Sequence, residues 1–146
     1  MDDLEQNDGQ GFAAGTPILM ADGTLKRIEH IEVGDRVASF NGLGTLRPRM
    51  VLGHGAHSGC GLVSFDNLQV TPGQLFMIRC GRFIPLRNVG PSDPLVLQCG
   101  ALFDIELMSK VAGRHTAYNL WVEGPDCYIA SGYRVRGSVA DHAGQD

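Results

Sequence analysis

The sequence predicts an all-β protein with a duplicated β module, and three observations support this fold class. Glycine and proline are frequent, with 20 and 7 among 146 residues, and the apolar residues fall in short β-rich runs. Residues 16–20 and 25–28 flank Asp22-Gly23, a dipeptide that supplies the positive φ of a tight hairpin turn. The third observation is that the pattern around this hairpin occurs twice.

Residues 14–38 and 72–96 match without a gap, at a constant offset of 58 residues. The matching pairs are Gly15 with Gly73, Gly23 with Gly81, Asp35 with Asp93, Ile18 with Phe76, Leu25 with Phe83, Ile28 with Leu86, Ile31 with Val89 and Val37 with Leu95. Glycines set the geometry of turns and apolar residues set the buried face, so agreement at both indicates one fold element used twice. We therefore expect two copies related by an approximate two-fold axis. An unrelated small β protein would lack this symmetry.

The remaining elements are predicted from turn signals and short apolar runs. Residues 46–52 form a predicted strand, in which Pro48 indicates a sheet edge or a bulge. Residues 53–61 are rich in glycine and lack periodicity, which predicts a surface loop. The other predicted elements are a strand that follows Gly34-Asp35 and ends near Phe40, a hairpin of 62–65 and 68–71 around Asp66-Asn67, a bulged strand at 101–111, and closing strands at 117–122 and 128–135.

The length predicts one domain that buries about two-thirds of its surface on folding. Residues 1–10 are polar and predict a disordered flank, residues 11–137 predict the folded domain, and residues 138–146 predict a flexible tail. No apolar stretch approaches the roughly 20 residues that span a bilayer. The acidic N-terminus also lacks the basic and apolar regions of a signal peptide. We therefore expect a cytoplasmic monomer without membrane contact.

The charge balance argues against a nucleic-acid-binding protein. The formal net charge is −4 and the isoelectric point is about 5.7, so no basic field is available for phosphates. The four cysteines, Cys60, Cys80, Cys99 and Cys127, are widely separated and form no Cys-x-x-Cys pair. Their spacing alone allows two disulfides, but reduced thiols are the expectation for a cytoplasmic protein. We expect no cofactor.

Three sequence blocks resemble one known family. Residues 11–37 read GFAAGTPILMADGTLKRIEHIEVGDRV, residues 70–76 read VTPGQLF, and residues 118–124 and 128–137 read YNLWVEG and YIASGYRVRG. In this order and spacing they resemble the opening, Thr-x-x-His and closing segments of the Hint superfamily (Hedgehog and intein autoprocessing domains), especially its bacterial intein-like branch. The resemblance implies a horseshoe-like Hint fold and self-processing of a larger precursor. The partner would then be the chain's own flanking polypeptide.

The resemblance places Gly11 at the position of the family's first nucleophile. There a Cys or Ser side chain attacks the preceding carbonyl and converts the peptide bond into a thioester or ester, but glycine has no side chain. Thr71 keeps the first position of the Thr-x-x-His segment. Gln74 replaces the histidine, whose imidazole protonates the leaving nitrogen in the family. An amide can hydrogen-bond the scissile peptide but cannot deliver a proton.

The closing segment also departs from the family pattern. Asn119 stands where a carboxylate is common, and Arg136 and Gly137 stand where splicing members carry a histidine and a terminal asparagine that cyclises. Ser138 takes the place of the downstream acceptor nucleophile. We therefore expect a catalytically defective copy. The alternatives are an active cleaving or splicing domain that uses substitute residues, a chain inactivated on purpose at its first residue, and an incorrect alignment of these positions.

Two further candidates for chemistry compete with ordinary structural roles. Cys127 is a possible substitute nucleophile, but it lies eight residues beyond the position expected for one, so a small core residue is the favoured interpretation. His54, His57 and Cys60 have spacings compatible with zinc but lack a fourth ligand, so no metal site is expected. Trp121 is expected to pack in the core rather than to bind a ligand.

Overall fold

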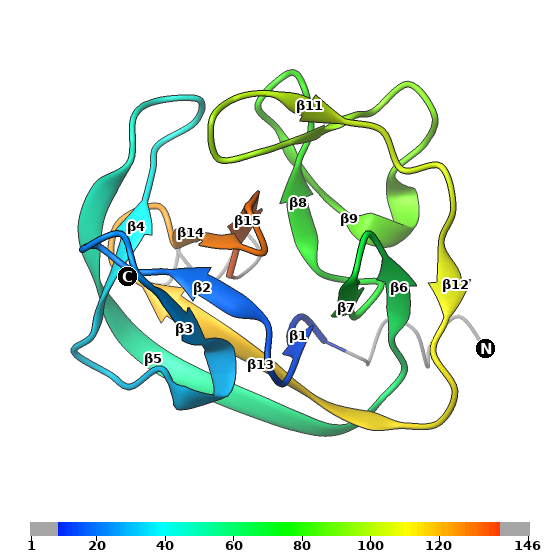
Figure 1. Cartoon of the computed structure of the whole chain (residues 1–146), viewed down its shortest axis with the longest axis horizontal. Helices are drawn as coiled ribbons and strands as arrows, with labels where there is room; N and C mark the ends of the chain where they lie inside the picture. Colours follow the sequence, from blue (N-terminus) through cyan, green and yellow to red (C-terminus); the bar gives the residue numbers. More distant parts are fainter. Residues whose placement is uncertain (1–8, 138–146) are drawn as a thin grey trace.

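The computed structural model describes residues 9–137 as short β-strands joined by tight turns (Figure 1). The helical elements of this part of the chain are two 3-10 helices, η1 (Ile28–His30) and η2 (Leu86–Asn88). The strands are β1 (Phe12–Ala13), β2 (Pro17–Leu19), β3 (Leu25–Arg27), β4 (Arg36–Ser39), β5 (Arg47–Cys60), β6 (Val63–Phe65), β7 (Leu68–Val70), β8 (Leu75–Met77), β9 (Phe83–Pro85), β10 (Leu95–Val96), β11 (Leu102–Phe103), β12 (Ser109–Lys110), β13 (His115–Val122), β14 (Cys127–Ala130) and β15 (Tyr133–Arg136). The predicted all-β class is confirmed. In the described residues, no helix is long and apolar enough to cross a membrane.

The positions of the elements confirm the predicted duplication. β2, β3 and η1 recur as β8, β9 and η2, at the same offset of 58 residues that relates the two sequence segments. β4 of the first copy corresponds to β10 of the second, where the strand is shorter. In Figure 1 the first copy lies at the left and the second at the upper right, with β14 and β15 between them.

The two copies also share their local hydrogen bonds. The matching bonds are Ile28 N to Thr16 O and Leu86 N to Gln74 O, both at 2.9 Å, Met20 N to Thr24 O at 2.8 Å and Ile78 N to Arg82 O at 2.9 Å, and Glu32 N to Asp35 Oδ2 at 3.0 Å and Gly90 N to Asp93 Oδ2 at 3.1 Å. Gly23 and Gly81 have φ angles of 90° and 93° at the two hairpin turns. Residues with a side chain rarely adopt this backbone conformation, so each turn favours a glycine.

A six-stranded sheet joins the copies in the order β3-β2-β14-β15-β8-β9. The β14–β15 hairpin forms its centre, with one hairpin of the duplicated module on each side. Ala130 of β14 pairs with Ile18, and Val135 of β15 pairs with Phe76 at the position equivalent to Ile18. The order of module strands is the same from either edge, as a two-fold axis through the central hairpin requires.

A second sheet, in the order β12-β6-β7-β1-β13-β5-β4, contains the long pair of β5 and β13 that curves along the lower side of Figure 1. β5 extends from Arg47 to Cys60, so the expectation of a surface loop at 53–61 is wrong. Ladder pairing with β13 keeps this glycine-rich run extended, and glycine carries no side chain that would reveal a buried face. Pro48 lies beyond the stretch paired with β13, which agrees with the predicted edge position.

Two other predicted strands are divided in the structure. The expected bulged strand at 101–111 is instead two separate short strands, β11 and β12, which belong to different sheets. Residues 104–108 lie outside both strands. The expected closing strand at 128–135 is the hairpin of β14 and β15. Ser131 and Gly132 turn the chain there, with φ angles of 50° and 87°. Ser-Gly is a turn signal, and the apolar residues on both sides concealed it.

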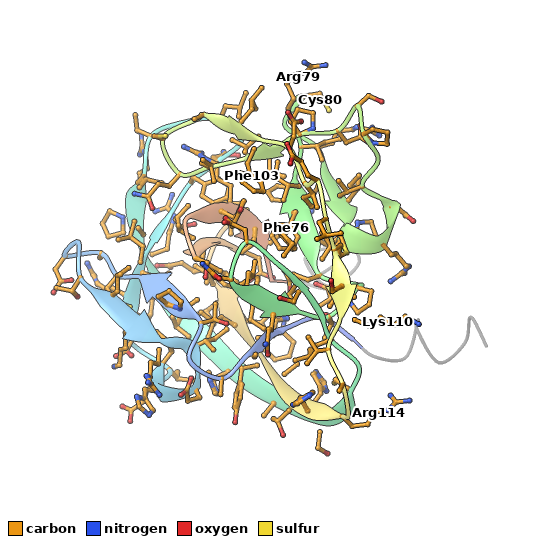
Figure 2. The ribbon with its side chains drawn as sticks, turned by 45° about the vertical axis from the view of Figure 1, so that its right-hand side comes forward. Phe76, Arg79, Cys80, Phe103, Lys110 and Arg114 are labelled. Atoms are coloured by element: carbon orange, nitrogen blue, oxygen red, sulfur yellow. The ribbon has the colours of Figure 1, made fainter. Side chains whose placement is uncertain are left out.

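The core is organised around Phe76, which is fully buried. Its ring makes edge-on contacts with Phe12, Phe65 and Tyr133, with centroid separations of 6.1, 6.0 and 5.9 Å. These four rings come from β8, β1, β6 and β15, so the cluster connects the two sheets. Figure 2 shows Phe76 near the centre of the molecule. Edge-on aromatic pairs stabilise a core beyond the area that they bury.

Trp121 does not belong to the core, contrary to the expectation. Its side chain is 43% exposed, and its neighbours Leu120 and Val122 occupy the buried positions of β13. The indole lies over Gly53, where a Cβ atom would be 2.3 Å from the ring. Side chains alternate between the two faces of a strand, so the buried neighbours Leu120 and Val122 put the Trp121 side chain on the opposite, exposed face.

Candidate functional site

The first half of the candidate site lies where the N-terminal residues meet the end of β7. Gly11 N donates to Thr71 Oγ1 at 3.1 Å, and Thr71 N donates to Gly11 O at 3.0 Å. Thr71 Oγ1 in turn donates to Gly9 O at 3.2 Å. The threonine side chain is fully buried. Thr71 therefore binds the backbone on both sides of the Gln10–Gly11 peptide.

The second half brings the C-terminal strand to the same turn through Gln74. Its Nε2 donates to Arg136 O at 2.8 Å and to Leu75 O at 3.2 Å. Gln74 is fully buried, and its Oε1 has no hydrogen-bond partner within residues 9–137. Gln74 N also donates to Thr71 O at 3.2 Å, so Thr71 and Gln74 belong to one tight turn. One turn thus contacts both ends of the described chain.

Asn119 binds the last described residue. Its Nδ2 donates to Gly137 O, while its Oδ1 accepts a hydrogen bond from the hydroxyl of Tyr128 at 2.8 Å. Burial raises the pKa of Tyr128 well above its ordinary value, so the hydroxyl stays protonated and acts as the donor. The tyrosine thereby directs the amide nitrogen toward Gly137. Tyr128 was not among the sequence candidates, because nothing in its local sequence indicates a partner nine residues earlier.

Gly11 and Gly137 occupy positions with no room for a side chain. A Cβ atom on Gly11 would lie 2.8 Å from Tyr118 O, and one on Gly137 would lie 2.2 Å from Leu120 O. Both distances are well inside van der Waals contact. Both obstacles are backbone oxygens of β13, which cannot rotate away as a flexible side chain can. The backbone therefore closes around both glycines.

Comparison with solved structures identifies the fold. A bacterial intein-like domain from Clostridium thermocellum superposes with a TM-score of 0.75 at 22% identity, over 88% of this chain and 98% of that chain. The chain has the Hint fold of inteins. The gp41-1 intein superposes at 0.71 with 17% identity, and a DnaB intein from Synechocystis at 0.72 with 17%; both cover 88% of this chain, and 98% and 99% of their own. No protein-family model and no curated protein matches the sequence.

The Hint fold gathers the positions that sequence reasoning selected. Three of these residues act through their side chains. The other three take part through their backbone, and two of them are glycines. The side-chain contributors are Thr71, Gln74 and Asn119, and the others are Gly11, Arg136 and Gly137. Ser138 lies outside the described residues 9–137. The three side chains that bind the two chain ends, those of Thr71, Gln74 and Asn119, are therefore neutral, whereas the buried Asp126 carboxylate lies close to Gly137.

Cys127 lies on β14 of the Hint fold as the core residue that the sequence suggested. Its side chain is buried with Phe40, Met77 and Ile129. Burial raises the pKa of its thiol to about 12, and its Sγ donates to Pro125 O at 3.3 Å. Only the thiolate is a strong nucleophile, so this cysteine is inert near neutral pH.

His54, His57 and Cys60 do not form a metal centre. They lie on β5, where residues three apart point to opposite faces, so His54 and His57 diverge. His54 Nε2 lies 2.9 Å from Ile28 O, and Cys60 Sγ donates to His57 O at 3.4 Å. Within residues 9–137 there is no group of three or more His, Cys, Asp or Glu side chains that could hold a metal ion.

The cysteines are expected to differ sharply in reactivity. Cys80 and Cys99 are exposed, and Figure 2 shows Cys80 beside Arg79 at the outer tip of the β8–β9 turn. Arg82 Nε lies 3.4 Å from Cys80 Sγ and lowers the pKa of that thiol. Native alkylation followed by mass spectrometry should label Cys80 and Cys99, and Cys127 only after denaturation. A Cys80→Ser variant, in which Cys99 is the remaining exposed cysteine of the described residues, is the control. If Cys127 in the folded protein were labelled as fast as Cys99 in that variant, the burial argument would be contradicted.

Proposed function

We propose that this chain is a Hint-fold module that has lost self-processing chemistry and serves as a structural or interaction domain within a larger precursor. The observation that carries the proposal is the closure of the backbone around Gly11 and Gly137. A family member would carry its attacking and cyclising side chains at these two positions. Here neither side chain is present, and neither has space.

The retained polar groups also favour a binding role over a catalytic one. Gln74 donates one amide hydrogen bond to Arg136 O of the C-terminal strand and another to Leu75 O of β8, and it has no ionisable group to protonate a leaving nitrogen. Asn119 likewise carries no charge. Through its side-chain hydroxyl, Thr71 accepts a hydrogen bond from Gly11 N and donates one to Gly9 O. Together these side chains act as a clamp on the two ends of the domain.

The clamp suggests what the module does for its host. Gly9, Gly11 and Arg136 all bind the same Thr71–Gln74 turn, so polypeptide flanking residues 11–137 would leave from neighbouring points. A module of this kind holds two segments of a longer chain close together without cutting them. The partner in this proposal is the chain's own flanking polypeptide.

Intact-mass measurement on a fusion tests the proposal directly. The chain is produced between two stable reporter domains and incubated with dithiothreitol or hydroxylamine, which release thioester-linked and ester-linked fragments. We expect the full-length mass to persist over days. Release of a fragment ending at Gln10 or at Gly137 would overturn the proposal if an Asn119→Ala or Thr71→Ala variant stopped that release.

One observation favours a second candidate, which is cleavage after Gly137. Asn119 Nδ2 donates to Gly137 O, where it would stabilise negative charge developing on that oxygen. Ser138 is next in sequence. Its Oγ would attack the carbonyl carbon of Gly137, the peptide C–N bond would break as its nitrogen takes a proton, and water would hydrolyse the resulting ester. In the same fusion, loss of C-terminal cleavage in Ser138→Ala would identify this route.

A further inference from the structure

A groove away from the candidate site lies between the β6–β7 hairpin and the segment that joins β11 to β12. Its volume is about 340 Å³. Phe65, Phe103 and Ile105 form its apolar wall, and the rings of Phe65 and Phe103 both pack against Tyr133 with centroids 5.7 Å away. Figure 2 shows Phe103 turned toward the interior. The wall is therefore anchored in the main core.

Apolar side chains continue from this wall onto the surface. Leu107 is 78% exposed, and Leu102 and Met108 are also exposed. From Phe103 to Leu107 the sequence alternates apolar and acidic residues, a pattern typical of a strand with one buried face. The apolar row thus runs past the edge of the core, where no described residue covers it. Exposed apolar surface that adjoins a groove with a polar rim, as Leu107 does here, is a feature of interaction sites.

The backbone of the same segment is open as well. Residues 104–108 lie between β11 and β12 and belong to neither strand. In the described part of the chain, no turn or loop hydrogen bond of the backbone involves them. Figure 1 shows this segment on the outer right-hand side of the molecule, beyond β6. Unpaired amide and carbonyl groups beside an apolar row can accept an added strand.

The rim of the groove is acidic. Asp66, Asp104 and Glu106 line it, and none of them forms an ion pair within residues 9–137. Asp104 and Glu106 are two residues apart, so they match basic residues at alternate positions of a neighbouring strand. The Asp66 carboxylate accepts a hydrogen bond from Tyr133 at 2.6 Å, which holds it at the groove. Charge and backbone therefore favour the same kind of ligand.

We propose that this groove binds an extended segment of a partner protein in which lysine or arginine alternates with aliphatic residues. The segment would pair with the open backbone of residues 104–108, place its cations beside Asp104 and Glu106, and cover Leu107. This interaction does not depend on whether the candidate site cleaves. It gives the module a binding surface separate from its two chain ends.

Charge argues against the other occupants of the groove. Residues 1–8 contain four acidic and no basic residues, and residues 138–146 contain two aspartates and no lysine or arginine. Either tail would be repelled by the acidic rim. A second copy pairing through the same segment would bring like charges face to face, which destabilises neighbouring strands. A nucleic acid is excluded for the same reason.

Peptide binding to the full chain tests the proposal. The probe is acetyl-Lys-Val-Lys-Val-Lys-Val-amide, and the controls are its Glu-Val counterpart and a Lys-Lys-Lys-Val-Val-Val peptide of the same composition. Binding is followed by fluorescence anisotropy, and amide hydrogen exchange locates it. We expect the alternating basic peptide to bind more tightly than both controls and to protect amides of residues 104–108. Weaker binding in high salt is expected as well.

Matched variants separate this groove from general attraction to an acidic protein. Glu106→Gln should weaken binding about threefold, because an exposed charge partner at the rim of the groove is lost. Glu32→Gln removes the same charge from an exposed position in the first module and should leave binding unchanged. Leu107→Ser should weaken binding while preserving the charge. Equal effects of Glu106→Gln and Glu32→Gln, protection outside residues 104–108, or a dimer that forms through this segment would each overturn the proposal.

Discussion

Replacing Phe76 with alanine is expected to lower the free energy of unfolding by about 3–5 kcal/mol. The ring is fully buried and touches Phe12, Phe65 and Tyr133 edge-on. The cavity left by the substitution cannot collapse easily, because the rings around it come from three other strands, β1, β6 and β15, that are hydrogen-bonded into two sheets. Urea unfolding followed by circular dichroism should therefore show a much lower transition midpoint.

Leu25→Ala is the control for this substitution. Leu25 matches a position in the second copy of the module, but its side chain is 67% exposed, so the expected change lies within about 0.5 kcal/mol. A loss below about 1 kcal/mol for Phe76→Ala would mean that the aromatic cluster does not connect the sheets.

The Phe76→Ala variant should also loosen the candidate site, because Gln74 directly precedes β8. Faster amide exchange at residues 136–137 would report that loosening.

The sequence was sufficient to predict the elements whose geometry depends on local residues. Asp22-Gly23 specified a hairpin because glycine alone adopts its positive φ readily, and the same requirement at Gly81 revealed the second copy. Asp66-Asn67 specified another hairpin, and both residues have positive φ angles, of 50° and 63°. These features need no knowledge of the rest of the chain.

The errors at residues 53–60 and 101–111 have a common cause, which is pairing between distant segments. Residues 53–60 have no strand-like sequence pattern, but β13 supplies a ladder partner more than fifty residues away and makes them a strand. Residues 101–111 have such a pattern, but no continuous partner accompanies them. Trp121 differs in cause, because its aromatic residue type favours the core, whereas its buried neighbours Leu120 and Val122 put it on the exposed face. Strand formation depends on context more than turn formation does.

The candidate site divides in the same way. Residue identities lead to the prediction that the chain lacks a nucleophile at Gly11, an imidazole at Gln74 and an asparagine at Gly137, and this stays a prediction. They could not predict what the remaining groups do. The orientation of Asn119 depends on Tyr128 across a turn, and the closure at the two glycines depends on backbone oxygens of β13. Such contacts become visible only when the strands are placed in space.

Gly137→Asn, which returns the family's terminal residue, is expected to lower the free energy of unfolding by about 2 kcal/mol, and Gly137→Ala by a similar amount. The reason is that the first side-chain atom, common to both, would lie 2.2 Å from Leu120 O. Relief requires the end of β15 to move, which strains the bond from Gly137 N to Asp126 O, now 2.8 Å long. Urea unfolding and exchange of the residue 137 amide measure both effects.

Gly55→Ala provides the matched control on β5, because no atom lies within 4 Å of a Cβ built there. Its stability should equal or slightly exceed that of the parent, since alanine restricts the unfolded chain. A large loss in Gly55→Ala as well would attribute the effect to glycine replacement in general. Unchanged stability in Gly137→Ala would show that β15 moves aside freely, and the steric argument for the proposed loss of chemistry would then fail at this position. Equal losses in both Gly137 variants mean instead that the backbone itself has adapted to glycine at this position.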